Sequence, residues 1–166
     1  MTDRLETVTY RPIGIVHTPF TEVDGMPIQP TAALGVRGSI DLTAGFEPGL
    51  LDLDGFSHLT LLYHLHEIGR ARLVVTPFLD DAPHGVFATR SPARPNPLGI
   101  STVRLVAIHG CTLEIEDVDM LDGTPLLDIK PYVPEFDDRQ GARVGWLSGR
   151  LDRLTEVRAN RRLRRP

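Results

Sequence analysis

The sequence predicts an all-β domain that folds as a small closed or strongly bent β-barrel with a short C-terminal helix. Fifteen glycines and fourteen prolines divide the 166 residues into short runs, several of which alternate apolar with polar residues. A period of two indicates strands with one buried face. From residue 144, apolar residues recur every three or four positions, which is typical of an amphipathic helix. We therefore expect a barrel domain over residues 1–141, with a helix and basic tail over residues 142–166 packed on the same domain.

The expected strands follow the chain from residue 10 to residue 129. The clearest covers residues 58–66, where Leu59, Leu61 and Tyr63 share the face that should be buried. Residues 45–53 suit a short helix, and Gly110 suits a hairpin turn between two later strands. The remaining expected strands cover residues 10–17, 36–42, 71–78, 86–89, 100–108, 112–118 and 126–129.

The composition excludes several classes of protein. With 41% hydrophobic and 24% charged residues, the chain resembles an ordinary globular domain. No apolar run is long enough to span a membrane, and the N-terminal segment lacks a signal-peptide core, so we expect a cytoplasmic protein without a membrane segment. The single Cys111 excludes an intrachain disulfide. The sequence contains neither a G-x-G-x-x-G motif nor a P-loop, and these absences argue against a doubly wound nucleotide-binding fold.

No metal site is expected. His64 and His66 are two residues apart on one strand face, a spacing that suits chelation, but we favour a polar lining for this pair. The net charge of −4 divides into +5 over residues 150–166 and −9 over the rest. An acidic body is not typical of nucleic-acid-binding proteins. The basic end is either a solvated terminus or a phosphate-contacting tail formed by Arg161, Arg162, Arg164 and Arg165.

Residues 85–101, with the sequence GVFATRSPARPNPLGIS, form the most informative segment. Its three prolines fix backbone angles and remove hydrogen-bond donors, so a stiff loop is expected between two strands. Such a loop holds Arg90, Arg94 and Asn96 in set directions. Binding sites are commonly built on loops that a rigid scaffold supports. A purely structural loop with two surface arginines is the alternative.

A second informative segment covers residues 121–132. Its Asp122–Gly123 pair suits a tight turn, where the backbone can approach a ligand closely. Asp128 and Lys130 alternate with apolar residues, which places a carboxylate and an amine on one strand face. They either face a ligand or pair with each other.

These segments resemble the TrmO (YaeB/TsaA-like) family of S-adenosylmethionine-dependent tRNA adenine-N6 methyltransferases. The matching stretches are GVFATRSPARPNPLGIS at 85–101, DGTPLLDIKPYVP at 122–134, GFSHLTLLYHLHE at 55–67 and the loop at 27–29, in family order. The resemblance implies a TsaA-like β-barrel, a homodimer, and S-adenosylmethionine bound in loops near the subunit interface. It also implies methylation of N6 of threonylcarbamoyladenosine, next to the anticodon of tRNA.

The resemblance also implies the cofactor contacts of this chain. Glu67 stands where the family has Gln, and it still offers an acceptor; Ile28 stands where many members have Arg. The implied cofactor-binding residues are Pro27, Ile28, Gln29, His66, Glu67, Arg90, Ile100, Asp122, Gly123, Thr124 and Pro125.

Methylation of N6 requires an acceptor for its proton, because the nitrogen lone pair is delocalised. We expect Asn96 and Asp128 to be catalytic, with Glu67 as a further proton acceptor. Arg94 and Lys130 are expected to bind the substrate. Two other functions stay open: a methyltransferase acting on another RNA base or a small molecule, and a noncatalytic S-adenosylmethionine-binding protein. Longer family members carry a further C-terminal domain, which leaves the tRNA substrate and the need for a partner protein open.

Overall fold

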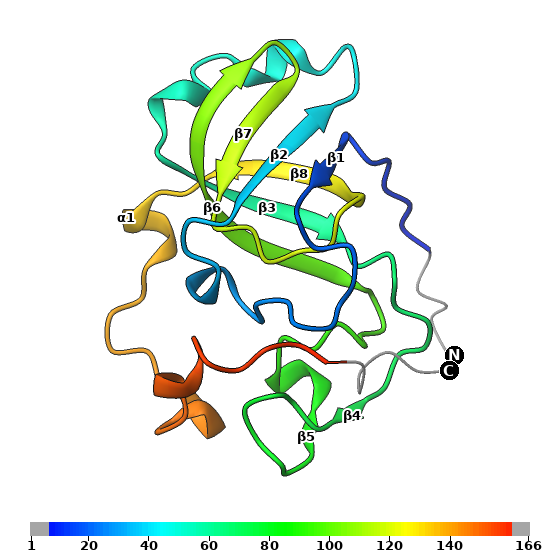
Figure 1. Cartoon of the computed structure of the whole chain (residues 1–166), viewed down its shortest axis with the longest axis vertical. Helices are drawn as coiled ribbons and strands as arrows, with labels where there is room; N and C mark the ends of the chain where they lie inside the picture. Colours follow the sequence, from blue (N-terminus) through cyan, green and yellow to red (C-terminus); the bar gives the residue numbers. More distant parts are fainter. Residues whose placement is uncertain (1–6, 161–166) are drawn as a thin grey trace, which may run out of the picture.

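A computed structural model of the chain describes residues 7–160 and contains a closed six-stranded barrel (Figure 1). All neighbouring strands are antiparallel, and their order around the barrel is β1-β2-β7-β6-β3-β8, with β8 pairing back to β1. The predicted all-β barrel is therefore confirmed. The barrel strands are β1 (Gly14–His17), β2 (Arg37–Leu42), β3 (His58–His64), β6 (Leu98–His109), β7 (Thr112–Glu116) and β8 (Thr124–Pro131).

The remaining elements are short. Strands β4 (Val74–Val75) and β5 (His84–Gly85) form a separate two-stranded sheet, and α1 (Pro134–Asp137) is one helical turn. No helix among residues 7–160 has the length and apolar character needed to cross a membrane. Single turns of 3-10 helix occur at Pro30–Ala32, Glu47–Leu50, Leu53–Gly55, Val86–Ala88, Gly145–Leu147 and Leu151–Arg153.

The barrel encloses the hydrophobic core. Leu59 and Leu61 of β3 are fully buried and Tyr63 nearly so, as the alternation of this strand predicted. Each fully buried aliphatic side chain contributes roughly 1.5–3 kcal/mol relative to an exposed one. The opposing strands supply further core residues, among them Val16, Ile40, Val103, Leu113, Ile115 and Leu126.

Two irregularities shape the barrel. Strand β6 pairs with β3 along its first half and with β7 along its second half, and the register shifts between Leu105 and Ala107. The β3–β8 register shifts between Leu62 and Tyr63. A bulge of this kind bends a strand and redirects the side chains beside it. The second shift lies at the end of the barrel where the cavity described below is found.

Most expected strands form within a few residues of their predicted limits, and the turn at Gly110, with φ of 59°, is confirmed. Three expectations are wrong. The strand expected at 86–89 is instead a 3-10 turn at Val86–Ala88, and residues 71–78 contribute only the two residues of β4. The expected amphipathic helix over 144–157 is two separate 3-10 turns. Gly145 and Gly149 have φ of 57° and 73°, left-handed values that interrupt a helix. A domain limit at residue 141 stays a prediction.

Candidate functional site

A cavity of about 780 Å³ lies at the end of the barrel where β3 ends and β6 and β8 begin. This volume is in the range of pockets that enclose a small organic molecule. Apolar side chains form most of its wall, including Met26, Leu65, Phe78, Phe87 and Leu121. A few polar side chains interrupt this wall, as in most ligand-binding pockets.

The structure brings together most of the residues proposed for the cofactor. Eight of the eleven line this cavity, although they come from four separate parts of the chain. Arg94, proposed for the substrate, also lines it. The eight are Pro27, Ile28, Gln29, His66, Glu67, Arg90, Ile100 and Thr124.

Six proposed residues lie outside the wall of this cavity in a single chain: Asn96, Asp122, Gly123, Pro125, Asp128 and Lys130. Lys130 Nζ lies 2.8 Å from Asp128 Oδ2, so these two side chains pair with each other on β8. Asn96 is exposed. The catalytic roles of Asn96 and Asp128 and the substrate role of Lys130 stay predictions.

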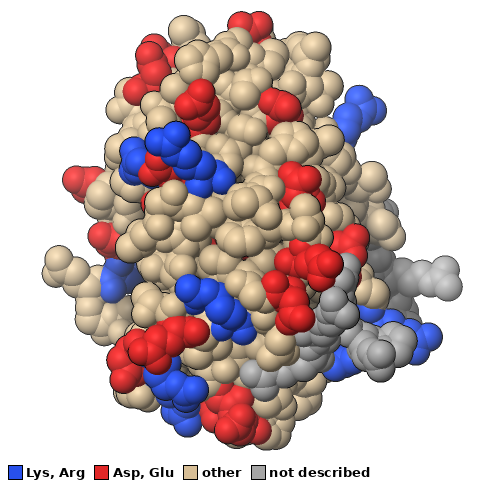
Figure 2. Space-filling model, viewed as in Figure 1, with Lys and Arg blue, Asp and Glu red and all other residues tan. Residues whose placement is uncertain are grey.

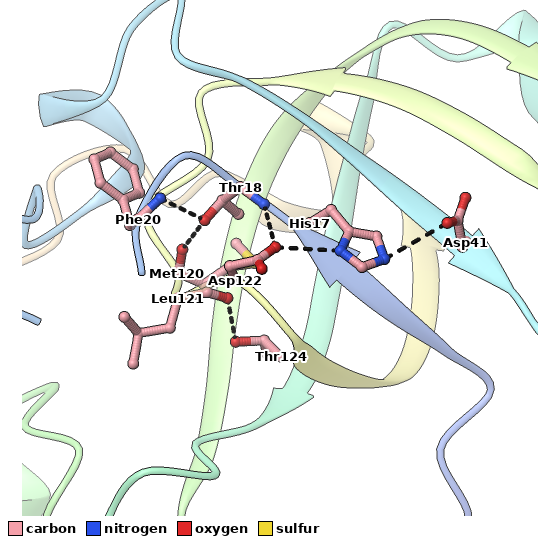
Figure 3. Close-up of polar contacts among 8 residues, drawn as sticks. All are labelled: His17, Thr18, Phe20, Asp41, Met120, Leu121, Asp122 and Thr124. Atoms are coloured by element: carbon pink, nitrogen blue, oxygen red, sulfur yellow. Dashed lines mark hydrogen bonds and ion pairs between the residues drawn. The ribbon is translucent and has the colours of Figure 1, made fainter. Parts of the chain in front are cut away.

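The Asp122–Gly123 turn holds the loop that follows β1 against the barrel (Figure 3). Asp122 Oδ1 accepts hydrogen bonds from the Thr18 backbone N–H at 3.1 Å and from His17 Nδ1 at 3.2 Å. The Thr18 hydroxyl donates to the Met120 carbonyl at 2.8 Å. The hydrogen bond from the Thr18 N–H is the main cause that lowers the pKa of Asp122, and the hydrogen bond from His17 lowers it further. The carboxylate thus anchors the loop, while the neighbouring Leu121 faces the cavity.

The proline-rich loop is fixed from within by Arg94. Its Nη1 lies 2.8 Å from the Thr89 carbonyl oxygen, 3.2 Å from that of Val86 and 3.4 Å from that of Ser91. Its guanidinium also lies over the Phe87 ring, 5.9 Å from the centroid. Arg94 is therefore largely engaged in holding the loop's shape. Its expected role toward a substrate stays a prediction.

Arg90 is directed differently from Arg94. Its side chain lines the cavity and donates from Nη1 to Gln29 Oε1 at 3.0 Å. This bond joins the proline-rich loop to the loop at residues 27–29. Because Arg90 is exposed, its guanidinium is accessible to a ligand that carries a carboxylate.

The C-terminal segment forms another wall, which the sequence did not indicate. Figure 1 shows residues 145–160, in orange to red, crossing below the barrel beside the loops that carry β4 and β5. Trp146 stacks on His84 with ring centroids 4.4 Å apart, and its Nε1–H donates to the Ala88 carbonyl at 2.7 Å. Ala159 exchanges backbone hydrogen bonds with Gly25 and Met26. The residues that this segment adds to the wall are Trp146, Leu147, Leu151, Leu154 and Ala159.

A carboxylate that sequence reasoning missed also faces the cavity. Asp119 follows β7 and lies between the buried Val118 and Met120. Its Oδ1 accepts a hydrogen bond from Ser101 Oγ at 2.6 Å, and Ser101 Oγ lies 2.9 Å from the Tyr63 hydroxyl. Burial raises the pKa of Asp119 to about 6, against the lowering effect of the Ser101 bond. The sequence signal for Asp119 was the position of an acidic residue between two apolar ones, Val118 and Met120.

No group of three or more His, Cys, Asp or Glu side chains within residues 7–160 is arranged to hold a metal ion. Of the two neighbouring histidines, His66 lines the cavity and His64 is exposed.

Comparison with known proteins assigns the fold and the loops to one family. A family model described as the tRNA-methyltransferase O N-terminal domain matches residues 15–138, which cover every barrel strand except for Gly14, the first residue of β1. The chain belongs to the TrmO family. A crystal structure of TrmO from Pseudomonas aeruginosa superposes with a TM-score of 0.72 at 38% identity, covering 85% of this chain and 63% of that one.

Curated relatives of this TrmO-family chain differ in length. A Pyrococcus abyssi protein named as a probable S-adenosyl-L-methionine-binding protein is 53% identical over 151 residues, which cover 91% of this chain and 82% of that protein. A human protein named tRNA (adenine(37)-N6)-methyltransferase is 35% identical over 136 residues, or 78% of this chain. The match spans only 31% of the human protein.

Proposed function

We propose that this TrmO-family chain binds S-adenosylmethionine in the cavity and transfers its methyl group to N6 of adenosine 37 in tRNA. The observation that carries the proposal is the convergence of eight proposed cofactor contacts on one cavity. The names of the relatives support it, because they include S-adenosyl-L-methionine-binding proteins and tRNA (adenine(37)-N6)-methyltransferases.

The charged side chains of the cavity suit this cofactor. S-adenosylmethionine carries a sulfonium, an ammonium and a carboxylate. Glu67 places a carboxylate in the wall for the positive groups, and Arg90 places a guanidinium for the carboxylate. The apolar remainder of the wall suits the adenosine portion. When bound, the cofactor supplies an electrophilic methyl group, and the chain's task is to align the acceptor nitrogen with it.

The acceptor is proposed more finely as N6 of threonylcarbamoyladenosine. Its threonyl carboxylate would be held by an arginine at the cavity, and the single-stranded anticodon loop presents the base at little cost in unstacking. Figure 2 shows basic and acidic side chains interspersed on one face rather than a single basic patch. The arginines at 161, 162, 164 and 165, proposed to contact phosphates, lie outside the described residues.

A cytoplasmic homodimer is also part of the proposal. Leu98 and Ile100 line the cavity yet leave 44% and 52% of their surface exposed. Large apolar side chains that stay exposed at a binding site often mark a surface that a partner chain covers. A second copy would also bring its own loops near this cavity. Light scattering coupled to gel filtration measures the assembly directly.

A noncatalytic S-adenosylmethionine-binding protein is the second candidate function. The name of the Pyrococcus abyssi relative, which refers to binding alone, favours it.

Transfer of labelled methyl groups separates these functions. The protein is incubated with methyl-labelled S-adenosylmethionine and either native threonine-accepting tRNA or the unmodified transcript of the same tRNA. We expect label at position 37 of the native tRNA only. Label in both tRNAs would remove the threonylcarbamoyl requirement, and cofactor binding without label in any tRNA would favour the noncatalytic function.

A further inference from the structure

Three side chains at the cavity, Tyr63, Ser101 and Asp119, are joined by hydrogen bonds. Ser101 Oγ lies 2.6 Å from Asp119 Oδ1 and 2.9 Å from the Tyr63 hydroxyl, so the three groups form a continuous hydrogen-bonded row. Ser101 and Tyr63 are buried, with 2% and 6% of their surface exposed, whereas Asp119 is only partly buried. Tyr63 and Asp119 both line the cavity. The row therefore ends at a carboxylate that a ligand can reach.

The backbone around this row leaves little freedom to its side chains. Gly99 pairs with Tyr63 across β6 and β3, and a Cβ at residue 99 would overlap the Tyr63 ring. The register shift between Leu62 and Tyr63 occurs at the same place. A bulge and a glycine together direct the Tyr63 hydroxyl toward Ser101. The Asp119 carboxylate is thereby held in one orientation, as a group that receives a proton in a reaction needs to be.

The surroundings of Asp119 also give it suitable chemistry. Burial raises its pKa to about 6, so the carboxylate is a stronger base than an exposed one and is still ionised at neutral pH. Arg90 and the Ser101 hydroxyl favour its charged form. Tyr63, His66 and Glu67 are the other titratable side chains that face the same cavity, together with Arg94.

We propose that the Asp119 carboxylate accepts the proton that the acceptor nitrogen loses during methyl transfer. The proposal rests on the proposed methyltransferase function and names the base within that site. As the nitrogen–methyl bond forms, the methyl–sulfur bond breaks. Its electron pair stays on sulfur, which becomes a neutral thioether. The N6 proton passes to Asp119, which later releases it to solvent. Asp128, by contrast, pairs with Lys130 and lies outside the wall of this cavity.

The first test needs no turnover. In the free protein labelled with ¹³C-aspartate, NMR should find one carboxyl group that titrates near pH 6. This signal should be missing in D119N. In S101A it should titrate at higher pH, because a hydrogen bond that favours the charged form is lost. A carboxyl signal of Asp119 that titrates near pH 4 would overturn the proposal.

The second test follows methyl transfer to tRNA. We expect turnover by D119N to fall at least ~100-fold, while the matched exposed variant E114Q keeps the wild-type rate. For the wild type, kcat/KM should rise with pH through about 6, since kcat/KM reports the free enzyme. D119N should lose this rise and H66Q should keep it. Loss of the rise in H66Q would assign it to His66 and overturn the proposal.

Two further outcomes are informative. If D119N keeps at least about a third of the wild-type turnover, Asp119 is not the base. In the other outcome, D119N loses affinity for S-adenosylmethionine relative to wild type but keeps its affinity for S-adenosylhomocysteine, whose sulfur is uncharged. With unchanged turnover, that result would make Asp119 a counter-charge to the sulfonium, and the proposal would fail. Failure of the proposed function itself looks different. The wild type would then methylate no tRNA, although the NMR titration of Asp119 would still be observed.

Discussion

The barrel and the loops that enclose the cavity are stabilised in different ways. Barrel strands bury side chains such as Leu61 and Leu113 completely and join neighbouring strands by regular backbone ladders. The enclosing loops are joined by side chains that bond to backbone carbonyls, as Arg94 and Trp146 do. Each such bond contributes only about 0.5–1.5 kcal/mol net.

This difference separates stability from binding. The barrel encloses the larger hydrophobic cluster, whereas the loops bury a small one around Val75, Val86 and Ala93 and set the shape of the cavity. Changes in the barrel should therefore act mainly on unfolding. Changes in the loops should act mainly on ligand affinity and on local opening.

The largest effect on stability is expected in the barrel. Leu61→Ala removes a fully buried side chain and leaves a void, which should lower the free energy of unfolding by about 3 kcal/mol. Urea unfolding followed by circular dichroism measures this change. Leu51→Ala is the matched control, since Leu51 is 81% exposed and its loss should change stability by less than about 0.5 kcal/mol. Equal losses of unfolding free energy in the two variants would show that the buried barrel side chains do not dominate stability.

A smaller effect on stability, with a larger effect on binding, is expected at Trp146. Trp146→Ala removes both the stack on His84 and the hydrogen bond to Ala88. We expect about tenfold weaker binding of S-adenosylmethionine and faster amide exchange over residues 145–160, at a cost in unfolding free energy of about 1–2 kcal/mol. Trp146→Phe keeps a ring and loses only the N–H donor, so its affinity for S-adenosylmethionine and its amide exchange rates should lie between those of Trp146→Ala and wild type. Unchanged exchange in Trp146→Ala would show that this contact does not hold the segment.

The smallest effect is expected at Asp122, and it depends on pH. Its lowered pKa means that the ionised carboxylate stabilises the fold above its ordinary pKa, and that this stabilisation is lost as the pH falls through the folded-state pKa. Asp122→Asn should therefore be less stable than wild type at pH 7, by less than about 1 kcal/mol because the side chain is partly exposed. The difference should shrink below about pH 4. A difference that grows toward low pH would contradict this account.

The same contrast explains what the sequence could predict. Alternation along residues 58–66 correctly placed Leu59, Leu61 and Tyr63 in the core, because a strand with one buried face repeats every two residues. The end of the chain showed a helical period, yet Gly145 and Gly149 adopt left-handed angles and divide it into separate turns. Local pattern was a reliable guide only where a regular ladder formed.

The cavity was predictable only in part. The proline-rich loop and the resemblance it carried identified Arg90 and its neighbours, which do line the cavity. Asp119 and Trp146 were missed because their positions depend on contacts between distant segments: Asp119 with Ser101, and Trp146 with Ala88. Neither contact leaves a periodic signal in the sequence.

The cavity between the proline-rich loop and the C-terminal segment is proposed to bind S-adenosylmethionine. Calorimetric titration of the wild type, Arg90→Ala and Arg37→Ala with S-adenosylmethionine tests this proposal most directly. Arg37 lies on β2, where it is 84% exposed and lies near Glu116, so it is the matched control. We expect saturable binding to the wild type and Arg37→Ala, and at least about tenfold weaker binding to Arg90→Ala. No binding heat with the wild type, or equal affinity in all three proteins, would contradict the account.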